Sequence, residues 1–238
     1  MSIASELSRI QQAKSDLATS IENKGVTVPA ATTLDGYAAL VDQIQQGGTL
    51  PYDAEIAYLE STGTQWIDTG ISPTTNTEVH IILRFNRFVT SSMLCAARTG
   101  TSNQNRFFPF AHSKNGEARC DYGTTEYYKN ITYGTIYEVL FNETSTHKCY
   151  IDGTSLGTLS GYTKTNNETL YFFGTSGYGS THYLGEGRIY RCVIKEGGVT
   201  VRDFIPVRVG TVGYMYDKVY GNLYGNAGTG NFNLGSDF

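Results

Sequence analysis

Apolar residues near the start of the chain recur with the period of a helix that has one apolar face. Spacings of four and three residues alternate along six positions, one of which is a lysine: Ile3, Leu7, Ile10, Lys14, Leu17 and Ile21. This alternation is a heptad seam in which Ile3, Ile10 and Leu17 take d and the other three positions take a. It predicts a helix of roughly 30 Å at 1.5 Å per residue.

This stripe requires a partner, because three heptads are marginal as an isolated helix. Isoleucine at d disfavours a two-stranded parallel coil and favours three or four strands, while Lys14 at an a position costs stability and would fix the register. We therefore expect residues 3–21 to join three chains. The alternative is that the stripe packs on the globular domain of its own chain.

A shorter helical pattern follows. Residues 23–25 (Asn-Lys-Gly) end the first helix, and residues 26–29 are extended. Thr32 to Asp35 supply an N-cap and an acidic first turn, and the apolar positions from Leu34 to Ile44 predict a short second helix. We expect residues 1–48 to be one helical segment. It is too small for a core of its own, which again favours association between chains.

Beyond residue 48 the pattern changes to the alternation of β-strands. In residues 77–85, TEVHIILRF, every second residue from Val79 to Phe85 is apolar. About a dozen such runs follow one another without a crossover helix, which excludes parallel βαβ units. Asp152-Gly153 and Gly197-Gly198 are hairpin signals between runs. We expect residues 49–238 to form an antiparallel β-sandwich or jelly roll.

Composition supports a β-rich chain and excludes some functions. Of 238 residues only 17% are charged, while glycine occurs 27 times and tyrosine 18 times, as suits short strands joined by tight turns. The net charge of −4 is wrong for an electrostatic nucleic-acid binder. No apolar run is long enough to cross a membrane, and the N-terminus lacks the pattern of a signal peptide. We therefore expect a soluble protein that is made in a cytoplasm, without nucleic-acid or membrane partners.

Residues that could carry catalysis or a cofactor do not form recognisable motifs. The four cysteines lie in strand-like runs without a C-x-x-C pair, and we interpret them as buried thiols: Cys95, Cys120, Cys149 and Cys192. Residues 153–157 match G-x-S-x-G, but between two strands rather than at a strand-to-helix elbow. Glu117 and Asp121 share a strand face near Glu126, yet no E-x-D-x-E string of a glycosidase occurs. We expect no enzymatic activity and no cofactor.

Two tyrosine-rich segments, 122–130 and 174–183, are the best candidates for ligand binding. We expect both to be loops that combine aromatic faces with small polar groups, a composition suited to glycan or protein contacts. The candidate residues are Tyr127, Tyr128, Tyr178, His182 and Tyr183. The alternative is that these tyrosines fill the core and rim of the sandwich.

Several stretches resemble concanavalin A-like, laminin-G-type sandwiches of phage and prophage tail or fibre proteins. They are YLESTGTQ (58–65), IDTG (67–70), HKCYIDGTSLG (147–157), LYFFGTS (170–176) and, most specifically, residues 185–230, with RDFIPVR, GYMYD and GNAGTG in order. Residues 22–44 resemble a short segment found near the ends of phage virion proteins. The resemblance covers nearly the whole chain.

The resemblance implies a virion-associated head or tail fibre assembled in the bacterial host cytoplasm. Such a protein would form a homotrimer, contact other virion proteins and present lectin-like heads to bacterial surface glycan. Some laminin-G modules hold calcium between paired aspartates; here Asp121 and Asp152 are candidates for such ligands, and a metal stays open. The alternatives are a purely structural decoration protein without a ligand and, less favoured, a carbohydrate-active enzyme.

Overall fold

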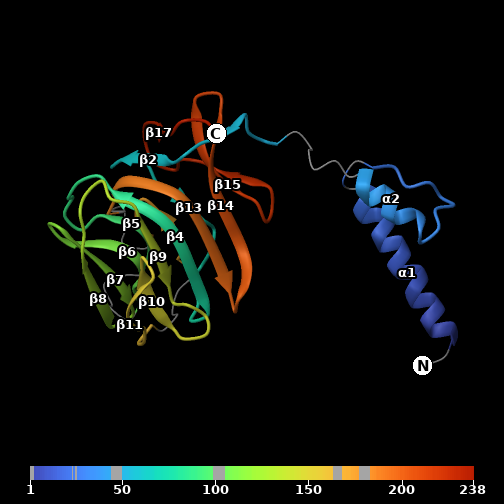
Figure 1. The fold of residues 1–238 in the computed structure, drawn as a ribbon, viewed down its shortest axis with the longest axis horizontal. Coiled ribbons are helices and arrows are strands. Elements are labelled where there is room, and N and C mark those ends of the chain that lie inside the picture. The colour runs from blue at the N-terminus through green and yellow to red at the C-terminus, as the bar shows by residue number, and fades with distance from the viewer. Residues whose placement is uncertain are drawn as a thin grey trace. The chain divides into compact units, whose positions relative to one another are not determined.

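The chain forms two compact units, residues 1–50 and residues 51–238. The computed structural model describes residues 3–22, 24, 26–43, 50–98, 105–162, 168–176 and 183–238. The first unit is helical and the second is built of strands (Figure 1). Neither helix of the described residues is long and apolar enough to span a membrane.

The first unit consists of the two predicted helices, α1 (Ile3–Glu22) and α2 (Gly36–Gln43). No glycine or proline interrupts α1, which ends just before the Asn-Lys-Gly sequence. Ile21, Tyr37 and Leu40 are buried together, and Ala18, Val26 and Val28 pack against them. The expectation that this unit holds no core was therefore wrong, because α2 lies against the C-terminal part of the α1 stripe and covers it.

The rest of the α1 stripe is open to solvent. Ile3, Leu7, Ile10 and Leu17 are 90, 56, 42 and 39% exposed, whereas Ile21 is 1% exposed. An eight-residue helix is about 12 Å long at 1.5 Å per residue, so α2 cannot cover a stripe of five turns. The heptad stripe is thus divided into a covered C-terminal part and an uncovered N-terminal part.

The second unit is a sandwich of two antiparallel sheets. The larger has eleven strands, eight of them in the order β11-β10-β9-β4-β13-β14-β15-β16, with β1, β2 and β17 attached beside this path. Its strands are β1 (Ala54–Glu55), β2 (Leu59–Thr62), β4 (Thr77–Phe85), β9 (Tyr137–Phe141), β10 (Lys148–Ile151), β11 (Thr154–Thr158), β13 (Glu186–Glu196), β14 (Val199–Val209), β15 (Val212–Asp217), β16 (Asn222–Tyr224) and β17 (Asn233–Leu234).

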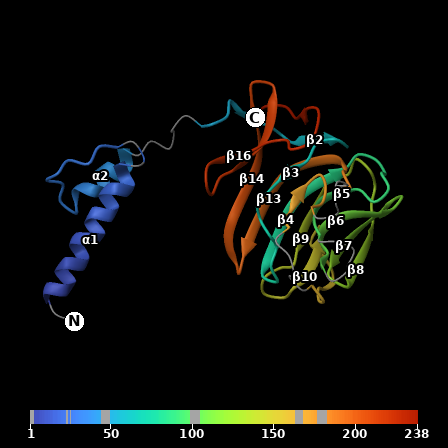
Figure 2. The ribbon, with the colours of Figure 1, turned by 180° about the vertical axis from the view of Figure 1, so that it is seen from behind.

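The smaller sheet has six strands in the order β3-β12-β5-β6-β7-β8. They are β3 (Ile67–Asp68), β5 (Met93–Ala97), β6 (Phe107–Lys114), β7 (Glu117–Tyr122), β8 (Thr125–Asn130) and β12 (Tyr171–Phe172). Opposite views show the two sheets as separate layers, with β4, β9 and β13 in one and β5 to β8 in the other (Figures 1 and 2). All strand ladders are antiparallel, as the missing crossover helices predict.

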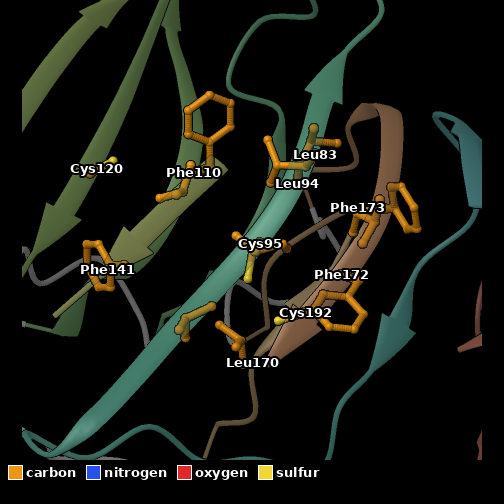
Figure 3. Packing of buried hydrophobic residues seen from close by; sticks show 14 of the residues in the cluster. Leu83, Leu94, Cys95, Phe110, Cys120, Phe141, Leu170, Phe172, Phe173 and Cys192 are labelled. Carbon is orange, nitrogen blue, oxygen red and sulfur yellow. The ribbon is translucent and has the colours of Figure 1, made fainter. Parts of the chain in front are cut away.

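Aromatic side chains fill the space between the sheets (Figure 3). Phe141 of β9 meets Phe107 of β6 edge to face, with ring centroids 5.0 Å apart. Phe204 of β14 meets Phe172 of β12 in the same way at 5.3 Å. Such pairs contribute roughly 0.5–1.5 kcal/mol beyond the area that they bury. The sandwich is therefore held together by rings contributed from both layers.

Other features of the strands agree with the sequence prediction. All four cysteines are buried and free, which confirms the interpretation as thiols. Asp152-Gly153 and Gly197-Gly198 join β10 to β11 and β13 to β14, and all four residues have positive φ, the requirement of a type I′ turn. Residues 153–157 pass from this turn into β11, so the G-x-S-x-G match forms no nucleophile elbow.

Segment 122–130, predicted as a loop, is instead a hairpin. Residues 125–130 form β8, which pairs with β7 from Tyr122↔Thr125 to Glu117↔Asn130. Gly123 permits the tight reversal: its φ is +61°, and a Cβ there would lie 2.0 Å from the carbonyl oxygen of Gly161. The loop prediction was wrong because the glycine marks only the turn, while the threonine and tyrosines after it favour a strand.

Candidate functional site

One row of side chains crosses the solvent face of the large sheet. The register places Tyr150 of β10 beside Leu140 of β9, Leu140 beside His80 of β4, His80 beside Val193 of β13, and Val193 beside Asp203 of β14. Successive side chains of a strand point to opposite faces of the sheet, so the residues of this row point away from the core. Aromatic, apolar and charged groups therefore alternate across five strands.

A second row lies one step along the same strands. Ile82 of β4 is flanked by Glu138 of β9 and Arg191 of β13. The two rows together leave Ile82, Leu140 and Val193 half-buried, with charged side chains on either side of them. The sheet face thus has an apolar floor between polar margins.

These rows line two adjoining hollows. One, of about 370 Å³, is lined by His80, Glu138, Leu140, Glu143, Tyr150 and Gly153. The other, of about 290 Å³, is lined by His80, Ile82, Glu138, Arg191 and Val193. Because His80 and Glu138 border both hollows, we treat the two as one site and call it the outer-face groove.

Contacts between polar side chains line the margins of the groove. The Nε2 atom of His80 lies 2.5 Å from Oε1 of Glu138, and the Arg191 guanidinium contacts both carboxylate oxygens of Asp203 at 3.1 and 3.2 Å. The backbone N–H of Glu138 donates to Oδ1 of Asp152 at 2.9 Å, which ties β9 to the β10–β11 turn. Because these side chains are largely exposed, their contacts are weak and can rearrange when a ligand binds.

The chemistry of the groove suits a ligand that is apolar on its faces and polar at its edges. Leu140, Ile82 and Val193 offer a surface for C–H groups, and Tyr150 offers an aromatic ring. Carboxylate, imidazole and guanidinium groups at the margins can hydrogen-bond to hydroxyl groups. A pyranose ring has this combination of apolar faces and equatorial hydroxyls.

The predicted ligand residues lie on or beside the other sheet. Tyr127 of β8 donates its hydroxyl to the carbonyl of Thr158 at 2.9 Å, and its ring lies against Gly157, where a Cβ would be 2.3 Å from the phenol oxygen. This tyrosine links β8 to β11. Tyr128 is 48% exposed and donates to Glu126 at 2.5 Å, so of the two it alone presents an open ring.

Tyr183 is half-buried and packs against a small apolar cluster on the solvent side of the small sheet: Met93, Ala96, Phe108 and Ala111. Its carbonyl accepts the N–H of Met93 at 2.9 Å. Tyr178 and His182 lie outside the described residues. The structure therefore brings Tyr127 and Tyr128 onto one strand, places Tyr183 against a different part of the sheet, and leaves the remaining two candidates as predictions.

A charged cluster lies beside Tyr128. Asp121 is fully buried and lies 3.2 Å from Arg106 and 3.5 Å from Arg119, while Arg106 also pairs with Glu126. Burial raises the pKa of Asp121 to about 6, although both guanidinium groups oppose the rise. Glu117 shares the solvent side of β7 with Asp121, as the spacing predicted. Asp121 is thus the buried centre of an ion-pair network with arginine on both sides.

A serine–histidine contact that the sequence did not indicate lies near the same sheet. The Ser92 hydroxyl is 2.6 Å from Nδ1 of His112, and both residues are buried. Burial lowers the pKa of His112 to about 4, so the ring is neutral near pH 7. It also stacks on Phe85 with centroids 3.6 Å apart. The pair does not line either hollow of the outer-face groove, and the His112 ring also meets Phe88 edge to face.

The two aspartates considered for calcium do not lie together. Asp121 is on β7 of the small sheet between arginines, which repel a cation, and Asp152 is in the β10–β11 turn of the large sheet. Among the described residues no three acidic, histidine or cysteine side chains form a cluster that could hold a metal ion. These donor sets do not fit calcium.

Sequence reasoning missed the outer-face groove. His80, Glu138 and Tyr150 are the solvent-facing members of alternating strands, so the signal was present as polarity at every second position. What was missing was the order of the strands, since β4, β9 and β10 are separated by up to 70 residues of sequence. A histidine and a glutamate on different strands cannot be assigned to one site until the order of the strands is known.

Comparisons with known proteins give matches among solved structures alone. No family model matches the chain, and no curated protein matches it. Three solved chains match, among them a Bacteroides ovatus protein described as a "putative carbohydrate binding protein", with 10% identity and a TM-score of 0.49. The match covers 76% of this chain and 60% of that chain. This chain is thus similar to part of that protein, while the antiparallel sandwich is shown by its own strands and register.

Proposed function

We propose that the sandwich is a non-catalytic glycan-binding head and that the outer-face groove is its binding site. The observation that supports this most strongly is the pair of adjoining hollows sharing His80 and Glu138, with an apolar floor and Tyr150 at one end. An exposed sheet face needs no such floor for stability, whereas a sugar ring requires one to cover its C–H faces. We expect a single groove to bind one sugar weakly, because it lies open on the face of a sheet.

We further propose that three copies join through the uncovered stripe of α1. Two of the residues beside the uncovered stripe, Ala4 and Ala13, are small and let helices approach closely there. Isoleucine at d favours three strands over two. Three heads held together gain avidity that a single shallow groove lacks.

The structure suggests how the lysine in the stripe is accommodated. The Lys14 ammonium lies 6.0 Å from the ring centroid of Tyr37, and the Tyr37 hydroxyl contacts the Lys14 carbonyl at 3.4 Å. Tyr37 belongs to α2, so each chain draws its own lysine toward its second helix. Three ammonium groups would then avoid meeting on a common axis, where like charges repel.

The setting that we propose is a virion fibre or decoration protein, as the resemblance to phage fibre modules implies. Purified phage particles from the source bacterium should contain the chain, which mass spectrometry of the particles would detect. A particle preparation without the chain would contradict this setting. The purely structural alternative is separated by ligand binding, and turnover of host polysaccharide that is lost in Glu117→Gln or Asp121→Asn would favour the enzyme alternative.

Glycan binding is tested with the full chain on a glycan array, followed by titration calorimetry of the best ligand. We expect Tyr150→Ala to weaken binding about ten-fold, since an aromatic contact of this kind contributes about 1.4 kcal/mol. Tyr128→Ala is the matched control on the small sheet and should leave affinity unchanged. Loss in Tyr128→Ala alone would move the site to the small sheet, and no binding at millimolar sugar would support the structural alternative.

Trimer formation is tested by the mass of the full chain in solution. We expect three chains in the wild type and one in the double variant Leu7→Asp, Ile10→Asp, because buried carboxylates destabilise the seam. Ser8→Asp with Gln12→Asp places the same charges on the opposite face of α1 and should keep the trimer. A trimer that survives Leu7→Asp, Ile10→Asp, or a wild type of another size, would contradict the proposal.

A further inference from the structure

Charge is distributed unevenly along the outer-face groove. At the end formed by β9 and β10 it carries the carboxylates of Glu138 and Glu143. Within the described part of the chain neither of them pairs with a lysine or arginine; Glu138 contacts only the ring of His80. At the other end the charge of Arg191 is balanced by Asp203. The one lysine of β10, Lys148, lies on the same side of the strand as Tyr150, so with Asp152 this end carries three carboxylates against one ammonium group and is the more negative one.

Hydrogen bonds from neighbouring residues stabilise the ionised carboxylate of Glu143. Its carboxylate accepts hydrogen bonds from the hydroxyls of Ser145 and Thr146 at 2.7 and 2.6 Å, and from their backbone N–H groups at 3.2 and 2.9 Å. These hydrogen bonds lower the pKa of Glu143 to about 2. The carboxylate thus stays ionised near neutral pH. Its hydrogen-bond donors are hydroxyl and backbone N–H groups, which are neutral and leave its negative charge unbalanced.

Asp152 adds a third carboxylate near this end. Its Oδ1 atom accepts the backbone N–H of Glu138, which places it in the turn that borders the groove at Gly153. Carboxylates around a hollow focus the electrostatic potential there, because field lines pass through solvent rather than through the sheet. The floor at this point is Leu140, with the ring of Tyr150 beside it.

We propose that the outer-face groove selects glycans that carry an ammonium group, such as N-deacetylated hexosamine polymers, and disfavours glycans that carry carboxylates. This inference rests on the proposed glycan-binding function and adds the charge class of the ligand. The sugar ring lies on Leu140 and Tyr150, and its ammonium lies between Glu138 and Glu143. A uronic acid in the same position would bring a third negative charge to two carboxylates that have no cationic partner.

The test compares three oligosaccharides of equal length with the full chain: glucosamine oligomers, N-acetylglucosamine oligomers and galacturonate oligomers. Calorimetry at low and moderate salt should give the order glucosamine, N-acetylglucosamine, galacturonate, and only the first should weaken as salt is raised. Glu138→Gln and Glu143→Gln should each weaken glucosamine binding about three-fold more than they weaken N-acetylglucosamine binding, as suits exposed charge pairs.

A control is needed because a chain of net charge −4 attracts any polycation. Asp35→Asn removes one exposed carboxylate from the helical unit and should not change glucosamine affinity. Equal losses in Asp35→Asn, unchanged affinity in both glutamine variants, or galacturonate binding at least as tightly as glucosamine would each overturn the inference while leaving glycan binding intact. If none of the three oligosaccharides binds at millimolar concentration and the array is also blank, the proposed function itself fails.

Discussion

The outer sides of the two sheets, which face away from the core between them, carry similar kinds of residue. These residues are exposed on the large sheet and buried on the small one. On the large sheet, Glu138 and His80 have side chains that are 56 and 40% exposed, and the apolar residues beside them are only half-buried. On the small sheet, Asp121 and Phe108 are completely buried. Charged and apolar groups are therefore accessible to a ligand on the large sheet and are buried on the small sheet, where they stabilise the fold.

The difference in burial indicates that residues of the small sheet serve stability and residues of the large sheet are free to bind a ligand. When one partner of a buried ion pair is removed, the other stays behind as an unpaired buried charge, which destabilises the fold. An exposed pair contributes little to stability and can be rearranged by a ligand. We expect substitutions on the small sheet to affect mainly the free energy of unfolding, and those on the large sheet to affect mainly binding. Four sets of variants test this division between the two sheets.

The largest effect is expected at the apolar cluster of the small sheet. Phe108→Ala removes a fully buried ring beside Met93 and Ala111 and should lower the free energy of unfolding by about 3–5 kcal/mol. Leu140→Ala, on the half-buried floor of the groove, should lower it by about 1 kcal/mol. Urea denaturation gives both values. Equal losses would mean that the two faces are not distinguished by burial.

The next effect concerns the ion pairs. Arg106→Ala leaves Asp121 buried beside Arg119 alone and should cost about 3 kcal/mol. Arg191→Ala breaks the exposed pair with Asp203 and should cost less than about 1 kcal/mol. Both are read from the same denaturation curves. A large loss in Arg191→Ala would show that the open face also carries structural charge.

Acid should act on two buried groups of the small-sheet side in opposite directions. His112 has a lowered pKa of about 4, so the unfolded chain takes up protons first and stability is lost as the pH falls from about 6.5 to 4. Asp121 has a raised pKa of about 6, so the folded chain takes up protons first and stability is gained as the pH falls from about 6 to 4. In the wild type the two effects largely cancel.

Variants separate these effects. In Asp121→Asn the free energy of unfolding should fall by about 2 kcal/mol between pH 6.5 and 4, because only the histidine effect remains. In His112→Phe it should rise over the same interval. Denaturation at a series of pH values measures both slopes, and parallel curves for the two variants would disprove the opposing assignment.

The smallest effect distinguishes the two tyrosines of β8. Tyr127→Phe removes the hydroxyl that donates to Thr158 and should cost about 1 kcal/mol of stability. Tyr128→Phe removes a hydroxyl that contacts Glu126 at the surface and should be almost neutral. Thermal unfolding resolves the difference. The reverse result would mean that Tyr128, rather than Tyr127, anchors the strand.

Much of the secondary structure could be predicted because it depends on local periodicity. The heptad spacing from Ile3 to Ile21 predicts α1, and the alternation in residues 77–85 predicts β4. The turns at Asp152-Gly153 and Gly197-Gly198 follow from residues that tolerate positive φ. The trimer and the role of the stripe stay predictions, because they concern contacts between copies.

Local patterns thus predicted most of the helices and strands, the antiparallel class and the burial of the four cysteines, since side-chain period, turn residues and missing crossovers are local properties. The order of the strands came from the three-dimensional structure alone, and with it the groove at His80 and Glu138 and the burial of Asp121. The structure also decided that Ile21 is covered within its own chain. These features depend on residues far apart in sequence, and no local pattern encodes which of two half-polar sheet faces is open to solvent.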